Sequence, residues 1–193
     1  MSEHAVHTDN NSSILKITVN LAVTCLVSGA ILAGAYFLTR PIAAKQEVLM
    51  EQKSKQALVS DAASFEEVEG QKEMSVAKAQ DGSIVAYVVS VESRGYGGAI
   101  KMLVAVTPEG KVYNFKILSA NETPGLGTKA SESPFKDQFP GKTSEQLVVT
   151  KDPSNTTNVQ AMTGATITSK AVTKGVKAAV DEVNAYLGEG NSK

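Results

Sequence analysis

The chain has 193 residues, a formal net charge of -1 and hydrophobic residues at 42% of its positions. This length can bury the core of one globular domain with an added segment, and the near-neutral charge argues against a nucleic-acid-binding surface. Cys25 is the single cysteine, so the chain alone cannot form a disulfide or a metal or iron–sulfur site made of several cysteines. Any redox chemistry therefore requires a different cofactor.

A polar tail comes first, predicted over residues 1–16, and its two histidines, His4 and His7, fit no recognisable catalytic arrangement. An uncharged run follows over residues 17–38, with the sequence ITVNLAVTCLVSGAILAGAYFL. A helix rises about 1.5 Å per residue, so this run is long enough to cross the ~30 Å hydrocarbon core of a membrane. We predict an uncleaved transmembrane helix rather than a signal peptide, because the small residues at 33–35 lie inside the apolar run and not after it.

Charge on the two sides of this span gives a weak indication of its orientation. Lys16 stands alone before the span, whereas several basic residues follow it, namely Arg40, Lys45, Lys53 and Lys55. Counted alone, these residues place the C-terminal domain in the cytoplasm by the positive-inside tendency. Small residues between Ser28 and Ala35 permit close packing against a neighbouring membrane helix, although ordinary span composition explains them equally well.

The remainder of the chain divides into a charged segment and a domain. Residues 39–70 read as a helical stalk, residues 71–188 as the domain, and residues 189–193 as a short tail. The stalk is predicted to connect the membrane span to the domain.

Within the domain, the pattern predicts a mixture of strands and a helix. Runs rich in Val, Ile and Tyr predict strands over residues 84–92, 100–107 and 112–118, with a further short strand over 146–150. The Pro-Glu-Gly-Lys turn at residues 108–111 predicts an antiparallel hairpin. Apolar residues at helical spacing predict a helix over residues 170–187. The predicted fold class is α+β, with an antiparallel sheet and flanking helices.

Three polar segments interrupt this pattern: SRGYGGAI at 93–100, SANETPGLGTKA at 119–130 and AMTGATITSKAV at 161–172. Each glycine loop alone reads as an ordinary turn, and neither matches the P-loop or the dinucleotide fingerprint. The hydroxyl residues of the third segment are typical of a helix N-cap. Taken together, the three segments indicate a ligand site with a phosphate at the start of a helix.

The sequence TGATITSKAV resembles the S/T-G-A-T motif of a family of FMN-binding domains. This family includes the G subunit of Rnf electron-transport complexes and the C subunit of sodium-translocating NADH:quinone reductase. ETPGLG is similar to the family's second signature, and the GYGG loop and the single N-terminal span extend the resemblance over most of the chain. The compact length is more similar to that of the Rnf protein.

The resemblance implies that Thr166 carries FMN through a phosphoester made by a flavin transferase. It also implies an electron relay within a membrane complex that couples electron flow between ferredoxin and NAD to the pumping of sodium ions or protons. The flavin domain is then expected on the extracytoplasmic side, against the charge count. Gln160 is a departure, because the family commonly has an acidic residue six positions before the modified threonine.

The expected site joins all three polar segments, with no catalytic residue and no metal ligand of its own. A phosphate on Thr166 is expected near the first turn of the following helix, where free amides favour an anion. Leu126 is expected against the flavin ring. Thr163, Thr168 and Ser169 are expected to hydrogen-bond the phosphate, with Lys170 nearby. The full set of candidate cofactor-binding residues is Thr163, Gly164, Ala165, Thr166, Thr168, Ser169, Lys170, Glu122, Thr123, Pro124, Gly125, Leu126, Gly127 and Tyr96.

An alternative is a membrane-anchored binding or assembly module without a redox cofactor. In that case the TGAT segment is only a helix cap and ETPGLG only a turn.

Overall fold

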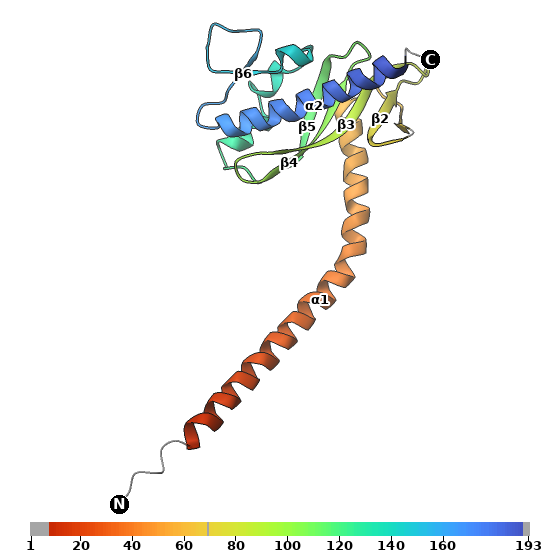
Figure 1. Cartoon of the computed structure of the whole chain (residues 1–193). Coiled ribbons are helices and arrows are strands. Elements are labelled where there is room, and N and C mark those ends of the chain that lie inside the picture. Colours follow the sequence, from red (N-terminus) through yellow and green to blue (C-terminus); the bar gives the residue numbers. More distant parts are fainter. Residues whose placement is uncertain (1–7, 69, 191–193) are drawn as a thin grey trace, which may run out of the picture. The chain divides into compact units, whose positions relative to one another are not determined.

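The computed structural model describes residues 8–68 and 70–190, so His4 and His7 lie outside the described residues. The chain divides into two compact units, one ending at Met50 and one beginning at Glu51. Helix α1, Thr8–Leu58, provides the first unit and continues into the second (Figure 1). Within the first unit, the stretch Ile14–Arg40 is long and apolar enough to cross a membrane, and it contains the predicted span over residues 17–38.

The second unit is built on an antiparallel sheet of five strands in the order β1-β2-β3-β4-β5 (Figure 1). The strands are β1 (Ser64–Val68), β2 (Gln71–Lys78), β3 (Ile84–Arg94), β4 (Ala99–Val106) and β5 (Val112–Ser119). Each strand pairs with its neighbour in sequence, so short turns are sufficient to connect them. The α+β fold class is confirmed, as is the hairpin between β4 and β5.

Sequence reasoning missed the first two strands. Helix α1 ends at Leu58, and residues 64–68 form β1, so the helical stretch is shorter than the predicted stalk over residues 39–70. The charged composition of residues 39–70 predicts a helix throughout, but β1 is an edge strand in which Glu66 and Glu67 are exposed. Pairing with β2 outweighs the local preference of these residues.

Both faces of the sheet are buried, which explains the long apolar runs in β3 and β4. Val89 and Val104 face a core shared with the C-terminal helix, whereas Val88 and Leu103 face a second core. Successive residues of a strand point to opposite faces, so one run of valines can serve both cores. The end of α1 covers the second face, since Leu58 is buried in that core.

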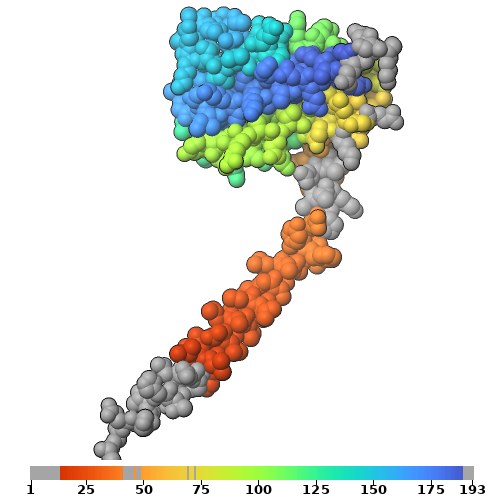
Figure 2. Space-filling view, in the orientation of Figure 1, coloured from red at the N-terminus to blue at the C-terminus, as the bar shows by residue number. Residues whose placement is uncertain are grey.

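Helix α2, Thr166–Gly190, lies across the first face of the sheet (Figures 1 and 2). It begins four residues before the predicted helix over residues 170–187. The Ser169 backbone N–H donates to the Ala165 carbonyl at 2.9 Å, which closes the first helical turn early. The predicted boundary is too late because the hydroxyl residues of TGATITS suggest a cap in front of the helix, whereas Thr166, Thr168 and Ser169 lie within its first turn.

Residues 127–160 form an irregular segment beside α2, shown cyan to light blue in Figure 2. The segment contains the short helices η1 (Gly127–Ser131), η2 (Lys136–Gln138) and η3 (Ser144–Gln146), and the parallel pair β6 (Val149–Thr150) and β7 (Val159–Gln160). The strand predicted over residues 146–150 is therefore shorter than expected and pairs outside the main sheet.

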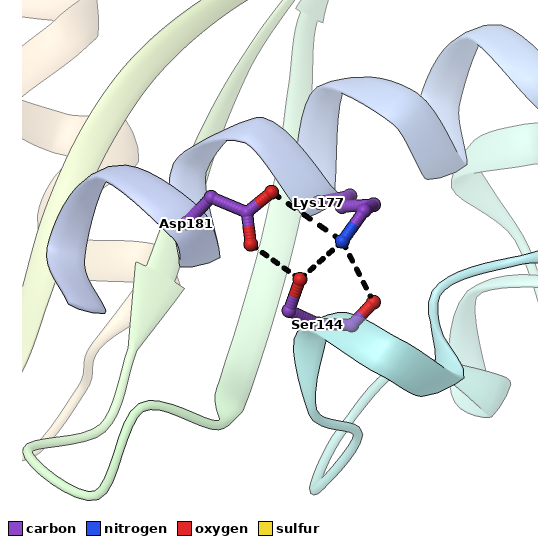
Figure 3. Close-up of polar contacts among 3 residues, drawn as sticks. All are labelled: Ser144, Lys177 and Asp181. Atoms are coloured by element: carbon purple, nitrogen blue, oxygen red, sulfur yellow. Dashed lines mark hydrogen bonds and ion pairs between the residues drawn. The ribbon is translucent and has the colours of Figure 1, made fainter. Parts of the chain in front are cut away.

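A polar cluster joins this segment to the middle of α2 (Figure 3). The Lys177 ammonium donates to the Ser144 carbonyl at 3.1 Å and forms an ion pair with Asp181 at 3.4 Å. The Ser144 hydroxyl also lies within hydrogen-bonding distance of both charged groups. These contacts hold η3, and with it the start of β6, against α2.

Candidate functional site

A pocket of about 670 Å³ forms where the three polar segments meet. Its volume lies within the usual range for small-molecule sites. The pocket lies wholly within the second unit. Its residues come from the β3–β4 loop, the segment after β5, the segment after β6, the turn between β7 and α2, and the first turn of α2. Its lining residues are Tyr96, Glu122, Thr123, Leu126, Gly127, Lys151, Gly164, Ala165, Thr166, Ile167 and Thr168.

Glu122 connects the three polar segments through its buried carboxylate. One oxygen accepts a hydrogen bond from the Gly97 backbone N–H at 3.1 Å. The other accepts from the Thr168 hydroxyl, which is itself buried at the start of α2. A buried carboxylate is tolerated when its oxygens are hydrogen-bonded in this way. Glu122 therefore holds one wall of the pocket together.

Two glycines allow this wall to form, because other backbone or side-chain atoms approach them closely. A Cβ added at Gly97 would lie 1.8 Å from the Asn121 carbonyl oxygen. At Gly127 it would lie 2.7 Å from the Glu122 side chain and 3.0 Å from the Thr168 hydroxyl. Gly97 and Gly127 are thus needed for close packing around Glu122 and its neighbour Asn121, which is a more specific role than an ordinary turn.

Ser169 holds the TGAT segment in its turn. Its buried hydroxyl donates to the Ala165 carbonyl at 2.9 Å and accepts from the Met162 backbone N–H at 2.9 Å. Gly164, at φ +77°, occupies the bend between these two residues. The Ser169 hydroxyl is therefore engaged within the chain, and Ser169 does not line the pocket.

Four hydroxyl residues of this segment were candidates for phosphate contact: Thr163, Thr166, Thr168 and Ser169. Thr168 and Ser169 are buried and bonded to Glu122 and to the local turn, respectively. Thr163 is exposed and does not line the pocket. Thr166 both lines the pocket and is free of side-chain hydrogen bonds in the described part of the chain.

The start of α2 contributes an electrostatic preference as well as this hydroxyl. Thr166, Ile167 and Thr168 form the first turn of the helix and line the pocket. The first amides of a helix have no carbonyl partners within it, and the positive end of the helix dipole favours an anion there. This end of the pocket is therefore suited to a phosphate.

The apolar lining of the pocket is suited to a planar aromatic group. Tyr96, Leu126 and Ile167 are large apolar or aromatic residues with exposed fractions of 71%, 43% and 55%. Apolar side chains gathered around a pocket mark a binding site more often than scattered ones do. The combination of apolar surface with an anion-binding helix end fits FMN, which has both a ring system and a phosphate.

Several candidate residues lie elsewhere, and two lining residues were missed. Pro124, Gly125 and Lys170 are exposed and do not line the pocket. Lys151 and Ile167 line it but were not among the candidates. Ile167 could have been inferred from its place between two candidate threonines, whereas Lys151 lies in a polar loop whose sequence carries no motif.

Comparison with known proteins agrees with this geometry. An FMN-binding domain model matches residues 95–181, a range that contains all the residues lining the pocket. The chain is similar to the G subunit of the proton-translocating ferredoxin:NAD(+) oxidoreductase complex of Clostridium ljungdahlii, at 52% identity over 93% of this chain and 96% of the relative. It is 34% identical to the G subunit of the Na(+)-translocating ferredoxin:NAD(+) oxidoreductase complex of Acetobacterium woodii, over 86% of this chain and 91% of that protein.

A solved structure is also similar, that of the C subunit of the Na(+)-translocating NADH-quinone reductase from Parabacteroides distasonis. It shares 25% identity and a TM-score of 0.49, covering 59% of this chain and 61% of the solved chain. The two curated relatives are matched over almost their full lengths. The chain therefore belongs to the family of oxidoreductase complex G subunits that carry an FMN-binding domain.

Proposed function

We propose that the chain is the membrane-anchored G subunit of an Rnf-type complex, in which it carries FMN as an electron relay. The complex is proposed to couple electron transfer between ferredoxin and NAD to the translocation of sodium ions or protons, as the names of the two curated relatives indicate for those proteins. The match to an FMN-binding domain favours this function over that of an assembly module without a cofactor.

The observation that carries the proposal is the position of the Thr166 hydroxyl. Thr166 lines the pocket at the first turn of α2, while the hydroxyls of Thr168 and Ser169 are bonded within the protein. A phosphoester at Thr166 would thus place the phosphate at the positive end of the helix dipole. Covalent attachment by a flavin transferase would also prevent loss of the cofactor.

Bound FMN supplies the redox chemistry, because a flavin accepts electrons singly or in pairs. The protein's own residues bind and orient the cofactor. Tyr96, Leu126 and Ile167 offer apolar surface to the ring, and Thr123 offers a hydroxyl at the pocket wall. Glu122 keeps the loops that bear these residues in place through its two hydrogen bonds.

The proposed attachment is tested by producing the full chain together with a flavin transferase. We expect the wild-type protein to fluoresce in a denaturing gel, and Thr166→Val to fold but lose this fluorescence. Thr163→Val is the matched control, because it changes a neighbouring threonine that lies outside the pocket. Covalent fluorescence retained in Thr166→Val would contradict the proposal, as would its absence from the wild type with an active transferase.

The second unit is proposed to lie on the extracytoplasmic side of the membrane. Two exposed turns offer labelling sites, Gly82 between β2 and β3 and Lys111 between β4 and β5. Cysteines at these positions, in a chain in which Cys25 is replaced by serine, should react with a membrane-impermeant reagent in intact cells. Labelling only after lysis would show that the charge count gives the correct orientation instead.

A further inference from the structure

We propose that Lys151 is the cation that binds the phosphate of the flavin, and that Gln160 positions it. This inference rests on the proposed placement of FMN in the pocket, with its phosphate near Thr166. Neither residue role follows from the sequence resemblance, in which Gln160 is a departure and Lys151 has no assigned place.

The charge of Lys151 is available to a ligand. Lys151 is the one cationic side chain that lines the pocket, and it forms no ion pair within the described residues 8–68 and 70–190. Glu122 also lines the pocket, but its carboxylate oxygens accept hydrogen bonds from Gly97 and Thr168 and form no ion pair with Lys151. The neighbouring carboxylate of Asp152 accepts hydrogen bonds from Ser154.

The backbone on both sides of Lys151 is fixed by the segment that leads into TGAT. The Thr150 carbonyl accepts a hydrogen bond from the Ala161 backbone N–H at 2.9 Å. The Asp152 carbonyl accepts one from the Gln160 side-chain amide at 2.6 Å, and the Asn155 carbonyl accepts another at 2.8 Å. Residues 160 and 161 therefore hold Lys151 between two anchored neighbours, beside the pocket that it shares with Thr166.

These contacts require an amide at position 160. The Gln160 side-chain nitrogen donates both hydrogen bonds to backbone carbonyl oxygens. An ionised carboxylate has no N–H to donate. In a Gln160→Glu variant, the carboxylate oxygens would therefore face the Asp152 and Asn155 carbonyl oxygens without a hydrogen between them. The loop that carries Lys151 thus gives Gln160 a role that an acidic residue could not fill.

The test compares FMN with riboflavin, which lacks the phosphate. Both are titrated by fluorescence into the full chain in detergent, produced without a transferase. We expect the wild-type protein to prefer FMN, and Lys151→Gln to weaken FMN binding about fivefold to tenfold while riboflavin binding is unchanged, because a charge-assisted hydrogen bond is lost. Lys151→Arg should retain the preference. Lys174→Gln is the matched control, since Lys174 is an exposed lysine of α2 that does not line the pocket.

Gln160→Glu tests the positioning role separately. It should reduce the FMN preference as Lys151→Gln does, and it should also increase amide hydrogen exchange over residues 151–158, which Lys151→Gln should not. Gln160→Glu with the wild-type preference and exchange would contradict the assigned role of Gln160.

The outcomes for Lys151 are equally distinct. Equal losses for FMN and riboflavin would contradict phosphate binding, because they would place Lys151 against the ring. A wild-type protein without preference for FMN, or without affinity for either flavin, would also contradict the inference. If Lys151→Gln keeps the wild-type FMN preference and is still flavinylated at Thr166, this inference fails while the proposed attachment stands.

Discussion

The two walls of the pocket differ in how they are held. The wall around Glu122 is buried, and its hydrogen bonds join residues that are 25 and 46 positions apart in the chain. The wall around Lys151 is exposed, and short-range contacts shape it, such as those between Asp152 and Ser154. The buried wall is thus coupled to the stability of the domain, whereas the exposed wall can change with little effect on folding.

The largest expected effect comes from removing the carboxylate of the buried wall. Glu122→Ala should lower the free energy of unfolding by about 2–4 kcal/mol, because it leaves a cavity and removes the hydrogen-bond partner of the buried Thr168 hydroxyl. Chemical denaturation of the full chain in detergent measures this change. Glu122→Gln is the control, since an amide can accept from Gly97 and donate to Thr168. If both variants are as stable as the wild type, the carboxylate does not hold this wall.

A smaller effect is expected from the glycines beside Glu122. Gly127→Ala places a Cβ 2.7 Å from the Glu122 side chain and should cost about 1–3 kcal/mol through overpacking. Gly125→Ala meets no atom within 4 Å, so only the strain of its φ of +74° opposes it, and its Cβ leaves Glu122 undisturbed. The two variants therefore separate crowding from strain. Chemical denaturation measures both costs, and a Gly127→Ala variant as stable as the wild type would contradict the crowding at Gly127.

The smallest effect is expected when acid protonates Asp152 in the exposed wall of the pocket. Hydrogen bonds from the Ser154 hydroxyl and backbone N–H lower the pKa of Asp152 below its ordinary value of 3.8. The ionised carboxylate thus stabilises the folded loop above that value, and this contribution is lost as the pH falls through the lower, folded pKa. Exchange-derived opening equilibria for residues 152–158, corrected for intrinsic rates, should therefore shift towards the open loop on acidification.

Asp152→Ala is the comparison for this experiment. It should show a larger open fraction than the wild type already at neutral pH, and little further change in acid. A pH response in Asp152→Ala equal to that of the wild type would assign the response to another group.

The sequence was sufficient for the parts of the fold that depend on local pattern. Strands β3, β4 and β5 follow from their apolar runs, and α2 follows from the helical spacing of Val172, Val176 and Val180. The start of α2 was placed too late, because a hydroxyl-rich segment suits both a loop and a first helical turn. Strand β1 was missed because its pairing with β2, rather than its composition, determines its conformation.

The site was predictable to a similar degree. The three motifs meet in one pocket, as expected from their joint presence. The specific use of each side chain was not predictable, because it depends on contacts between distant residues. Thr168 and Ser169 were expected to bind phosphate, yet their hydroxyls are bonded within the protein. Lys151 was missed because its place at the pocket follows from the pairing of β6 with β7.

The most direct test of the central claim is the mass of the peptide that contains the TGAT segment. Trypsin cleaves after Lys151 and after Lys170, so it should release residues 152–170 from the wild-type chain produced with a flavin transferase. We predict a gain equal to the mass of FMN less one water, with fragment ions that place it on Thr166. An unmodified peptide, or fragment ions that place the flavin on Thr163 or Thr168, would contradict the account.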